Sequence, residues 1–190
     1  MVFESFSAVG TVPVEVVGRF EERVPAGVVG AWREHGVGFI GDGYFRLVDP
    51  ARAQVMLGGS GVLPADAVVV LTTAMADVVA WWRDMFVVAK PRLGQINMAP
   101  MSFEQLCEGL VADDGVRDGV WEWEPYPAVV ERLGVPGFEE CFMHVPLLRM
   151  GGRGEASQMQ VGSVWMHIGL MMGLTGPLEF TRVINPPPSA

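Results

Sequence analysis

Any metal-binding or acid–base chemistry in this chain would have to use its three histidines, His35, His144 and His167. His35 ends a predicted helix, where an imidazole interacts favourably with the helix dipole and needs no further role. His144 lies in an apolar extended segment and His167 in an apolar helical segment, so we expect both to be core residues. The sequence has no His-Glu-x-x-His motif and no Cys/His cluster at zinc spacing. We therefore expect no bound metal and no cofactor.

Glycine-rich stretches that could cradle a phosphate lack the context that such loops need. Residues 36–41 match Gly-x-Gly-x-x-Gly, but they follow a predicted helix and lead into a hairpin. A dinucleotide-binding loop instead connects a strand to a helix. The runs at 58–61 and 151–154 are not followed by Lys-Ser or Lys-Thr, so neither is a nucleotide-binding P-loop.

The sequence also gives little support for a catalytic nucleophile or for a pair of catalytic carboxylates. There is no Gly-x-Ser-x-Gly motif, and the adjacent acids at 113–114 and 139–140 are expected to be solvated turn charges. The sequence thus predicts no catalytic residue and no enzyme. A weaker alternative is an active site around Asp77 and His144.

The two cysteines, Cys107 and Cys141, are too few for a disulfide framework. Cys107 falls on the apolar face of a predicted helix, so we expect it to act as a small core residue rather than a reactive thiol.

The segment 113–124 has the composition of a protein-binding surface. It holds five carboxylates and one arginine, hence a local charge of −4, together with two tryptophans. Large aromatic anchors inside an electrostatic rim are typical of interface hot spots. Alternatively, the segment flanks a helix and its tryptophans only cover the core. The predicted partner-binding residues are Asp113, Asp114, Asp118, Trp121, Glu122, Trp123 and Glu124.

Composition narrows the class of protein to which these residues belong. Half of the 190 residues are hydrophobic and 18% are charged, with a mean hydropathy of +0.32. The longest apolar run, 67–82, is interrupted by Thr72, Thr73 and Asp77 and is shorter than the roughly 20 residues that span a membrane. The N-terminus lacks the basic flank and apolar stretch of a signal peptide. We expect a cytoplasmic protein with no membrane partner.

The net charge of −9 and the pI near 4.7 argue against direct nucleic-acid binding, which needs a basic surface. The same charge suits a basic protein partner, although acidic chains are also common among ordinary cytosolic proteins. The sequence makes no prediction of oligomeric state.

The first elements that the sequence predicts are a helix and the β-hairpin that follows it. Residues 25–35 predict a helix that a glycine ends. Asp42-Gly43 predicts a two-residue turn that pairs Ile40 with Phe45, with both central residues at positive φ.

The remaining patterns complete a mixed fold. They predict a helix at 50–57, strands at 67–71, 78–82 and 85–88, a helix capped by Ser102, a helix at 127–133, an extended segment at 141–148 and a helix at 163–172. The last helix is apolar nearly all round, so we expect it to be buried centrally. The predicted fold class is α+β, with a mixed, largely antiparallel sheet, packed helices and a helix-richer C-terminal half.

The N-terminal half resembles the GAD-like family. Residues 32–50, which include Gly-Val-Gly-Phe-Ile-Gly-Asp-Gly-Tyr, resemble the opening signature of that family. Residues 71–81 resemble its second signature, with Ala76 where a glycine is usual before Asp77.

The C-terminal half resembles immunity proteins that carry a GAD-like domain. Residues 102–106 resemble a helix start of the family, and residues 164–177 resemble its closing helix. Residues 140–152 resemble a Glu-Cys-Phe block of these proteins, with Met143-His144 where glycine and an aromatic residue are typical.

The resemblance covers residues 25–177 in the expected order. It implies a GAD-like domain at 1–100 and an immunity-type domain at 101–182 packed against it. The proline-rich end of the chain separately predicts a disordered tail at 183–190. The resemblance also implies a cytoplasmic immunity protein that neutralises a cognate toxin with a basic nuclease domain, of the kind that type VI secretion delivers. The alternative is a non-catalytic intracellular binding module for another protein or a small ligand.

Overall fold

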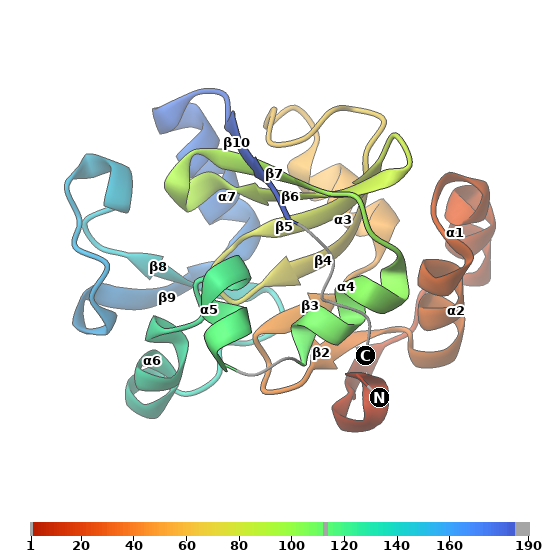
Figure 1. Cartoon of the computed structure of the whole chain (residues 1–190), viewed down its shortest axis with the longest axis horizontal. Helices are drawn as coiled ribbons and strands as arrows, with labels where there is room; N and C mark the ends of the chain where they lie inside the picture. The colour runs from red at the N-terminus through yellow and green to blue at the C-terminus, as the bar shows by residue number, and fades with distance from the viewer. Residues whose placement is uncertain (1, 112–113, 185–190) are drawn as a thin grey trace.

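The computed structural model describes residues 2–111 and 114–184, which form a mixed α+β fold around one large sheet (Figure 1). The α-helices are α1 (Val14–Phe20), α2 (Ala26–His35), α3 (Pro50–Leu57), α4 (Phe103–Leu110), α5 (Asp114–Trp121), α6 (Pro125–Leu133) and α7 (Val164–Thr175). The strands are β1 (Ser7–Gly10), β2 (Val37–Ile40), β3 (Phe45–Leu47), β4 (Val68–Thr73), β5 (Val78–Trp82), β6 (Met85–Lys90), β7 (Gln95–Ala99), β8 (Glu140–His144), β9 (Met159–Ser163) and β10 (Glu179–Val183). Short 3-10 helices are η1 (Val2–Ser5), η2 (Glu21–Arg23), η3 (Pro91–Leu93), η4 (Leu148–Met150) and η5 (Ala156–Gln158). The predicted fold class is confirmed.

The large sheet has the strand order β1-β2-β3-β4-β5-β6-β7-β10. Its neighbouring strands are antiparallel, except that β10 runs parallel to β7. Strands β8 and β9 form a separate antiparallel pair. Because β10 belongs to the C-terminal part, the predicted domains at 1–100 and 101–182 share one sheet, and their division at residue 100 stays a prediction.

The last described strand reaches into the segment for which the sequence predicts a disordered tail, 183–190. Val183 ends β10, and the next residue, Ile184, is buried and donates its amide to the carbonyl of Met98 at 2.7 Å. The rest of the predicted tail, 185–190, lies outside the described residues.

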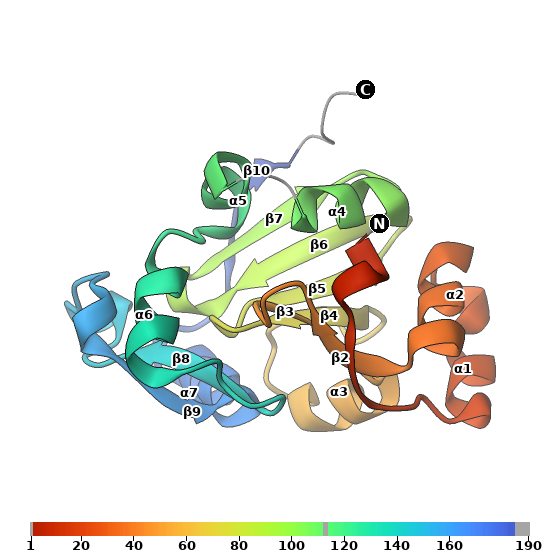
Figure 2. The same ribbon diagram turned by 90° about the horizontal axis from the view of Figure 1, so that it is seen from below.

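Helices cover both faces of the sheet, and each face has its own core (Figure 2). Helices α1, α2, α4, α5 and α6 contribute to the first core, whereas α3 and α7 contribute to the second. Strand β6 shows the alternation: Phe86 and Val88 belong to the first core, Val87 and Ala89 to the second. A sheet buried on both faces accounts for the apolar composition of the chain.

The hairpin between β2 and β3 has the predicted register but a different turn. Ile40 pairs with Phe45. However, positive φ occurs at Gly41 (64°) and Gly43 (85°), and Asp42 is not among the residues with positive φ. The prediction that Asp42 would adopt this conformation is wrong, because two flanking glycines provide it without a Cβ penalty.

Helix α7 is not central, contrary to the prediction from its apolar composition. Met166, Leu170 and Leu174 are 77%, 51% and 54% exposed, while Ile168 is fully buried. The helix lies in an outer layer beneath the sheet, so only one side of it faces the second core (Figure 2). Within the described part of the chain, no helix combines the length and the hydropathy that a membrane crossing requires.

Candidate binding groove

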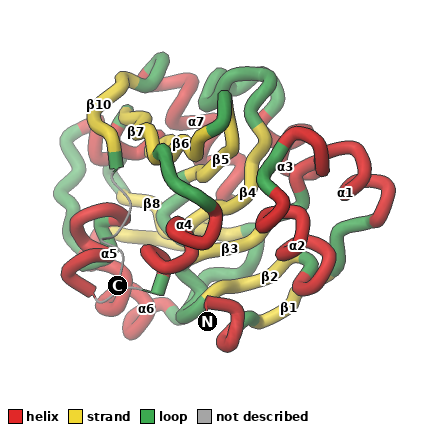
Figure 3. Tube along the Cα trace, turned by 45° about the vertical axis from the view of Figure 1, so that its right-hand side comes forward, coloured by secondary structure: helices red, strands yellow, loops and turns green. Residues whose placement is uncertain are grey.

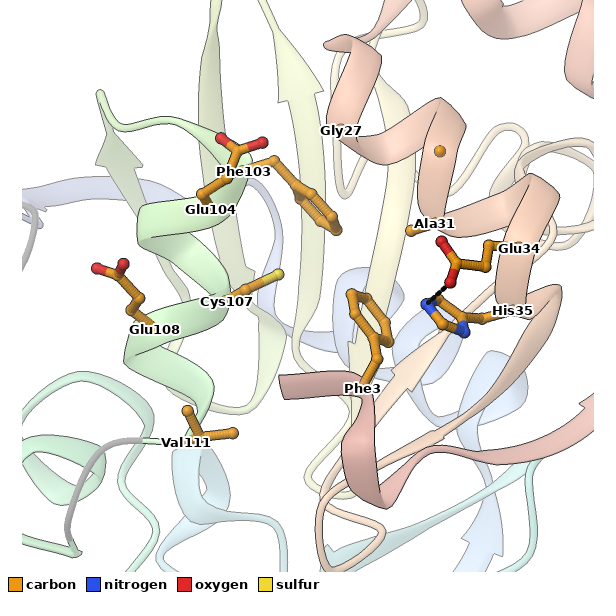
Figure 4. A pocket seen from close by; sticks show the side chains of 11 residues that line it. Phe3, Gly27, Ala31, Glu34, His35, Phe103, Glu104, Cys107, Glu108 and Val111 are labelled. Atoms are coloured by element: carbon orange, nitrogen blue, oxygen red, sulfur yellow. Dashed lines mark ion pairs between the residues drawn. The ribbon is translucent and has the colours of Figure 1, made fainter. Parts of the chain in front are cut away.

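A groove of about 610 Å³ lies between α2 and α4, beside η1 (Figure 4). Its floor is apolar and comes from three elements: Phe3 of η1, Ala31 of α2, and Phe103 and Cys107 of α4. Phe3 stacks on His35, with ring centroids 4.3 Å apart and an interplanar angle of 15°. This stacking holds η1 against the end of α2 and closes the floor.

The helix that forms one wall begins where the sequence predicts. The hydroxyl of Ser102 accepts from the amide of Gln105 at 3.2 Å, and the side chain of Gln105 accepts from the amide of Ser102 at 2.9 Å. One helical turn separates Phe103 from Cys107, so both face the floor. Burial raises the pKa of the Cys107 thiol to about 12, which keeps it protonated and unreactive at neutral pH.

The opposite wall is smooth because α2 carries small residues there. A side chain at Gly27 would place its Cβ 2.7 Å from Oε1 of Glu104 and 3.1 Å from the ring of Phe103. Gly27 therefore permits the close approach of α2 and α4. Gly30 has nothing within 4 Å of its Cβ position, so it faces the open groove together with Ala31.

The rim of the groove is acidic. Glu104 and Glu108 lie one turn apart on α4, and Glu34 stands on α2; all three are exposed. Among the residues that line the groove, none is Lys or Arg, and the only basic side chain is His35, which lies 3.9 Å from Glu34. An apolar floor under three carboxylates suits a ligand that is apolar on one side and positively charged on its flanks.

A buried ion cluster lies in a different part of the first face. The guanidinium of Arg92 donates from Nε and Nη2 to the two carboxylate oxygens of Asp77, each at 3.1 Å. Arg92 also pairs with Glu122, and Nζ of Lys90 donates to Glu122 and to the carbonyl of Val120, both at 2.7 Å. Burial opposes the charge on Glu122, but Arg92 and Lys90 outweigh it and hold the pKa of this carboxyl below its usual range.

The two core histidines lie near the same arginine. Burial, and then the charges of Arg92 and His167, together lower the pKa of His144 to about 4. Burial and then Arg92 also lower the pKa of His167. Both imidazoles are buried, as the sequence predicts. The alternative active site around Asp77 and His144 thus places both residues beside Arg92, but the carboxylate of Asp77 is fully buried and both of its oxygens are bonded.

The described residues contain no group of three His, Cys, Asp or Glu side chains that could hold a metal ion.

The structure does not gather the predicted partner-binding residues into one exposed patch. Trp121 and Trp123 are 2% and 4% exposed, so the alternative interpretation, in which they cover the core, describes their placement. Glu122 is engaged by Lys90 and Arg92. Asp118 is half-buried, and Glu124 is exposed. Asp114 begins α5, and Asp113 lies outside the described residues.

Sequence reasoning missed the groove because its walls are far apart along the chain. Two local signals were present: small residues at Gly27, Gly30 and Ala31, and the i, i+4 pair Glu104 and Glu108. Each is unremarkable alone, and only the packing of α2 against α4 joins them.

The fold is a mixed α+β arrangement, and helices form the walls of its groove. Residues 2–90 match the GAD-like domain family and form a GAD-like domain, which spans η1 to β6. The groove therefore has its α2 wall inside this domain and its α4 wall outside it.

Among solved structures, the fold is similar to the crystal structure of Atu4351 from Agrobacterium tumefaciens. The TM-score is 0.75 at 14% identity, over 95% of this chain and 90% of that chain. At this identity the similarity shows a shared fold. A comparison with curated protein sequences gave no match.

Proposed function

We propose that the chain is a non-catalytic immunity protein that binds a cognate secreted toxin and neutralises it inside the producing cell. The observation that carries the proposal is the groove between α2 and α4, with its apolar floor and acidic rim. The GAD-like domain at 2–90 and the net charge of −9 support it.

The charge gives the proposal a physical mechanism. A nuclease must present a basic surface to the phosphates of its substrate. An acidic protein that covers this surface competes with the nucleic acid and associates rapidly through long-range attraction. The toxin in this proposal is therefore a nuclease with a basic substrate-binding face.

The test is co-expression of the chain with the product of the adjacent gene. We expect the cells to survive, the two proteins to purify as a complex, and the affinity to fall with rising salt. Cell death without a complex would overturn the proposal. A stable, protective complex whose affinity does not change with salt would support the immunity function but contradict the electrostatic mechanism.

A second candidate function is binding of a small ligand, because the groove volume of about 610 Å³ lies within the range of small-molecule sites. In that case a metabolite should raise the melting temperature of the chain in the absence of any toxin. A screen of metabolites against the isolated chain, with no shift observed, would favour the toxin partner.

A further inference from the structure

We infer that the groove receives a single amphipathic α-helix of the partner, with an apolar stripe on the floor and Lys or Arg residues one turn apart facing Glu104 and Glu108. This inference rests on the proposed function and names the form of the partner that the groove recognises.

The walls favour a helix over an extended peptide. All of the lining residues belong to α2, α4 or η1, except Val111, which directly follows α4. The backbone groups of these helices are largely used within the helices themselves, so the groove offers no strand edge. An extended peptide would leave its own backbone groups unpaired there, whereas a helix satisfies them internally.

The floor and the smooth wall allow a helix to approach closely. Gly30 and Ala31 project little from α2, and the Cβ position of Gly30 is open. Phe103 and Cys107 supply apolar surface from α4. Helices pack with axes about 8–10 Å apart, and small residues on one partner favour the lower end of that range.

The carboxylates set the charge pattern of the occupant. Glu104 and Glu108 are four residues apart on one helix, and they would face basic residues at a similar spacing on a helix that lies alongside. Glu34 faces the same occupant from the opposite wall.

The first experiment measures the affinity of the full chain for the product of the adjacent gene. The variant Glu104→Lys/Glu108→Lys reverses the rim. The control Glu15→Lys/Glu131→Lys makes the same change in net charge at exposed positions outside the groove. We expect the rim variant to bind at least about tenfold more weakly than the control, because like charges would then face each other across the interface.

A second pair of variants fills the groove without changing charge. Gly30→Leu places a side chain into the groove, and Gly18→Leu places the same side chain on the exposed face of α1, where the Cβ position is equally open. Both replace a helical glycine by a stronger helix former, so both should fold at least as well as the native chain. We expect Gly30→Leu to abolish binding and Gly18→Leu to leave it unchanged.

Hydrogen exchange on the complex then tests the form of the occupant. We expect protection of one continuous segment of the partner with a helical spacing of apolar and basic residues. Reversing its basic residues to Glu should restore binding to the rim variant. Native binding that both groove variants leave intact overturns this inference while the proposed function stands. Protection of an extended segment overturns the helical occupant, and no binding by the native chain overturns both proposals.

Discussion

Glu122 holds the turn between α5 and α6 against the end of β6. Its backbone has a φ of 51°, a left-handed conformation that costs about 1 kcal/mol or more for a residue with a side chain. Its carboxylate accepts from Lys90, whose side chain is fully buried, and from Arg92. We interpret these ion pairs as the interactions that offset the unfavourable backbone conformation.

Removing this charge should destabilise the chain. We predict that Glu122→Gln lowers the free energy of unfolding by about 2 kcal/mol, since Lys90 and Arg92 would keep their charges and lose a carboxylate. The loss is smaller than for a fully buried pair because the side chain of Glu122 is 35% exposed. Urea denaturation measures it, with Glu124→Gln at an exposed neighbouring position as the control. Equal unfolding midpoints for the two variants would contradict the prediction.

The buried imidazole of His144 should make stability depend on pH. Its pKa is about 4 in the folded chain, below the usual value of 6.5. As the pH falls below 6.5, the unfolded chain binds a proton that the folded chain does not, so stability decreases until the pH reaches about 4. We expect this residue to account for at most about 3 kcal/mol of that decrease.

Urea denaturation over this pH range, on the native chain and on His144→Gln, measures the effect. In the variant, the free energy of unfolding should fall less steeply with decreasing pH, whatever its value at neutral pH. An unchanged slope would show that His144 does not titrate differently in the folded and unfolded chains.

The end of α2 illustrates how an element depends on one backbone position. Gly36 ends the helix with a φ of 74°, and a Cβ there would lie 2.2 Å from the backbone carbonyl oxygen of Gly10. Strand β1 pairs with β2 directly beside this point. A glycine is therefore required both for the turn out of α2 and for the approach of β1.

We predict that Gly36→Ala lowers the free energy of unfolding by about 2–4 kcal/mol, because the added methyl group meets backbone rather than a flexible side chain. The matched control is Gly30→Ala in the same helix, which should be neutral or stabilising by up to about 1 kcal/mol. Thermal unfolding of both variants checks the prediction. Similar melting temperatures would show that β1 can move away at little cost.

Elements with local signals were predictable from the sequence, and elements without them were not. The capping box before α4 and the run of β-branched residues in β4 can both be recognised in the sequence. Strand β10, by contrast, is exposed at all five residues and shows no alternation, because its order comes from backbone pairing with β7. Helix α5 was missed since Gly115, Gly119 and its acidic residues favour a loop interpretation.

The candidate site was less predictable than the fold, for a related reason. A segment with tryptophans beside acidic residues can form a protein interface or cover the edge of a core, and its local sequence is the same in both cases. Trp121 is buried because its ring packs edge-on against Phe45, with centroids 5.1 Å apart, and its carbonyl accepts from the hydroxyl of Tyr44 at 2.7 Å, from 77 positions away in the sequence. The sequence pattern contains no trace of that distant contact.

At the scale of the whole molecule, the two predicted parts depend on each other. The first face of the sheet carries Val79, Phe86 and Val88, which belong to the same core as Phe103 and Leu106 of α4. The segment 101–182 also supplies nearly all of β10, the neighbour of β7. The first hundred residues contain seven of the eight strands of the sheet, but they lack helices α4, α5 and α6, which cover its first face.

We predict that a fragment of residues 1–100 does not unfold cooperatively by itself, because this apolar face would be open to water. Co-expressed with a fragment of residues 101–190, it should form a complex with a single unfolding transition. Calorimetry on the fragment and on the pair makes the comparison. A cooperative transition for the fragment alone would show that residues 1–100 are an autonomous domain.

The parallel pairing of β10 with β7 also affects how the chain is made. During synthesis β7 emerges from the ribosome about eighty residues before the strand that covers its edge. Throughout that interval β7 presents unpaired backbone groups to other nascent chains. Mutations that slow the synthesis or docking of the C-terminal segment should therefore reduce the soluble yield, even where the finished protein would be stable.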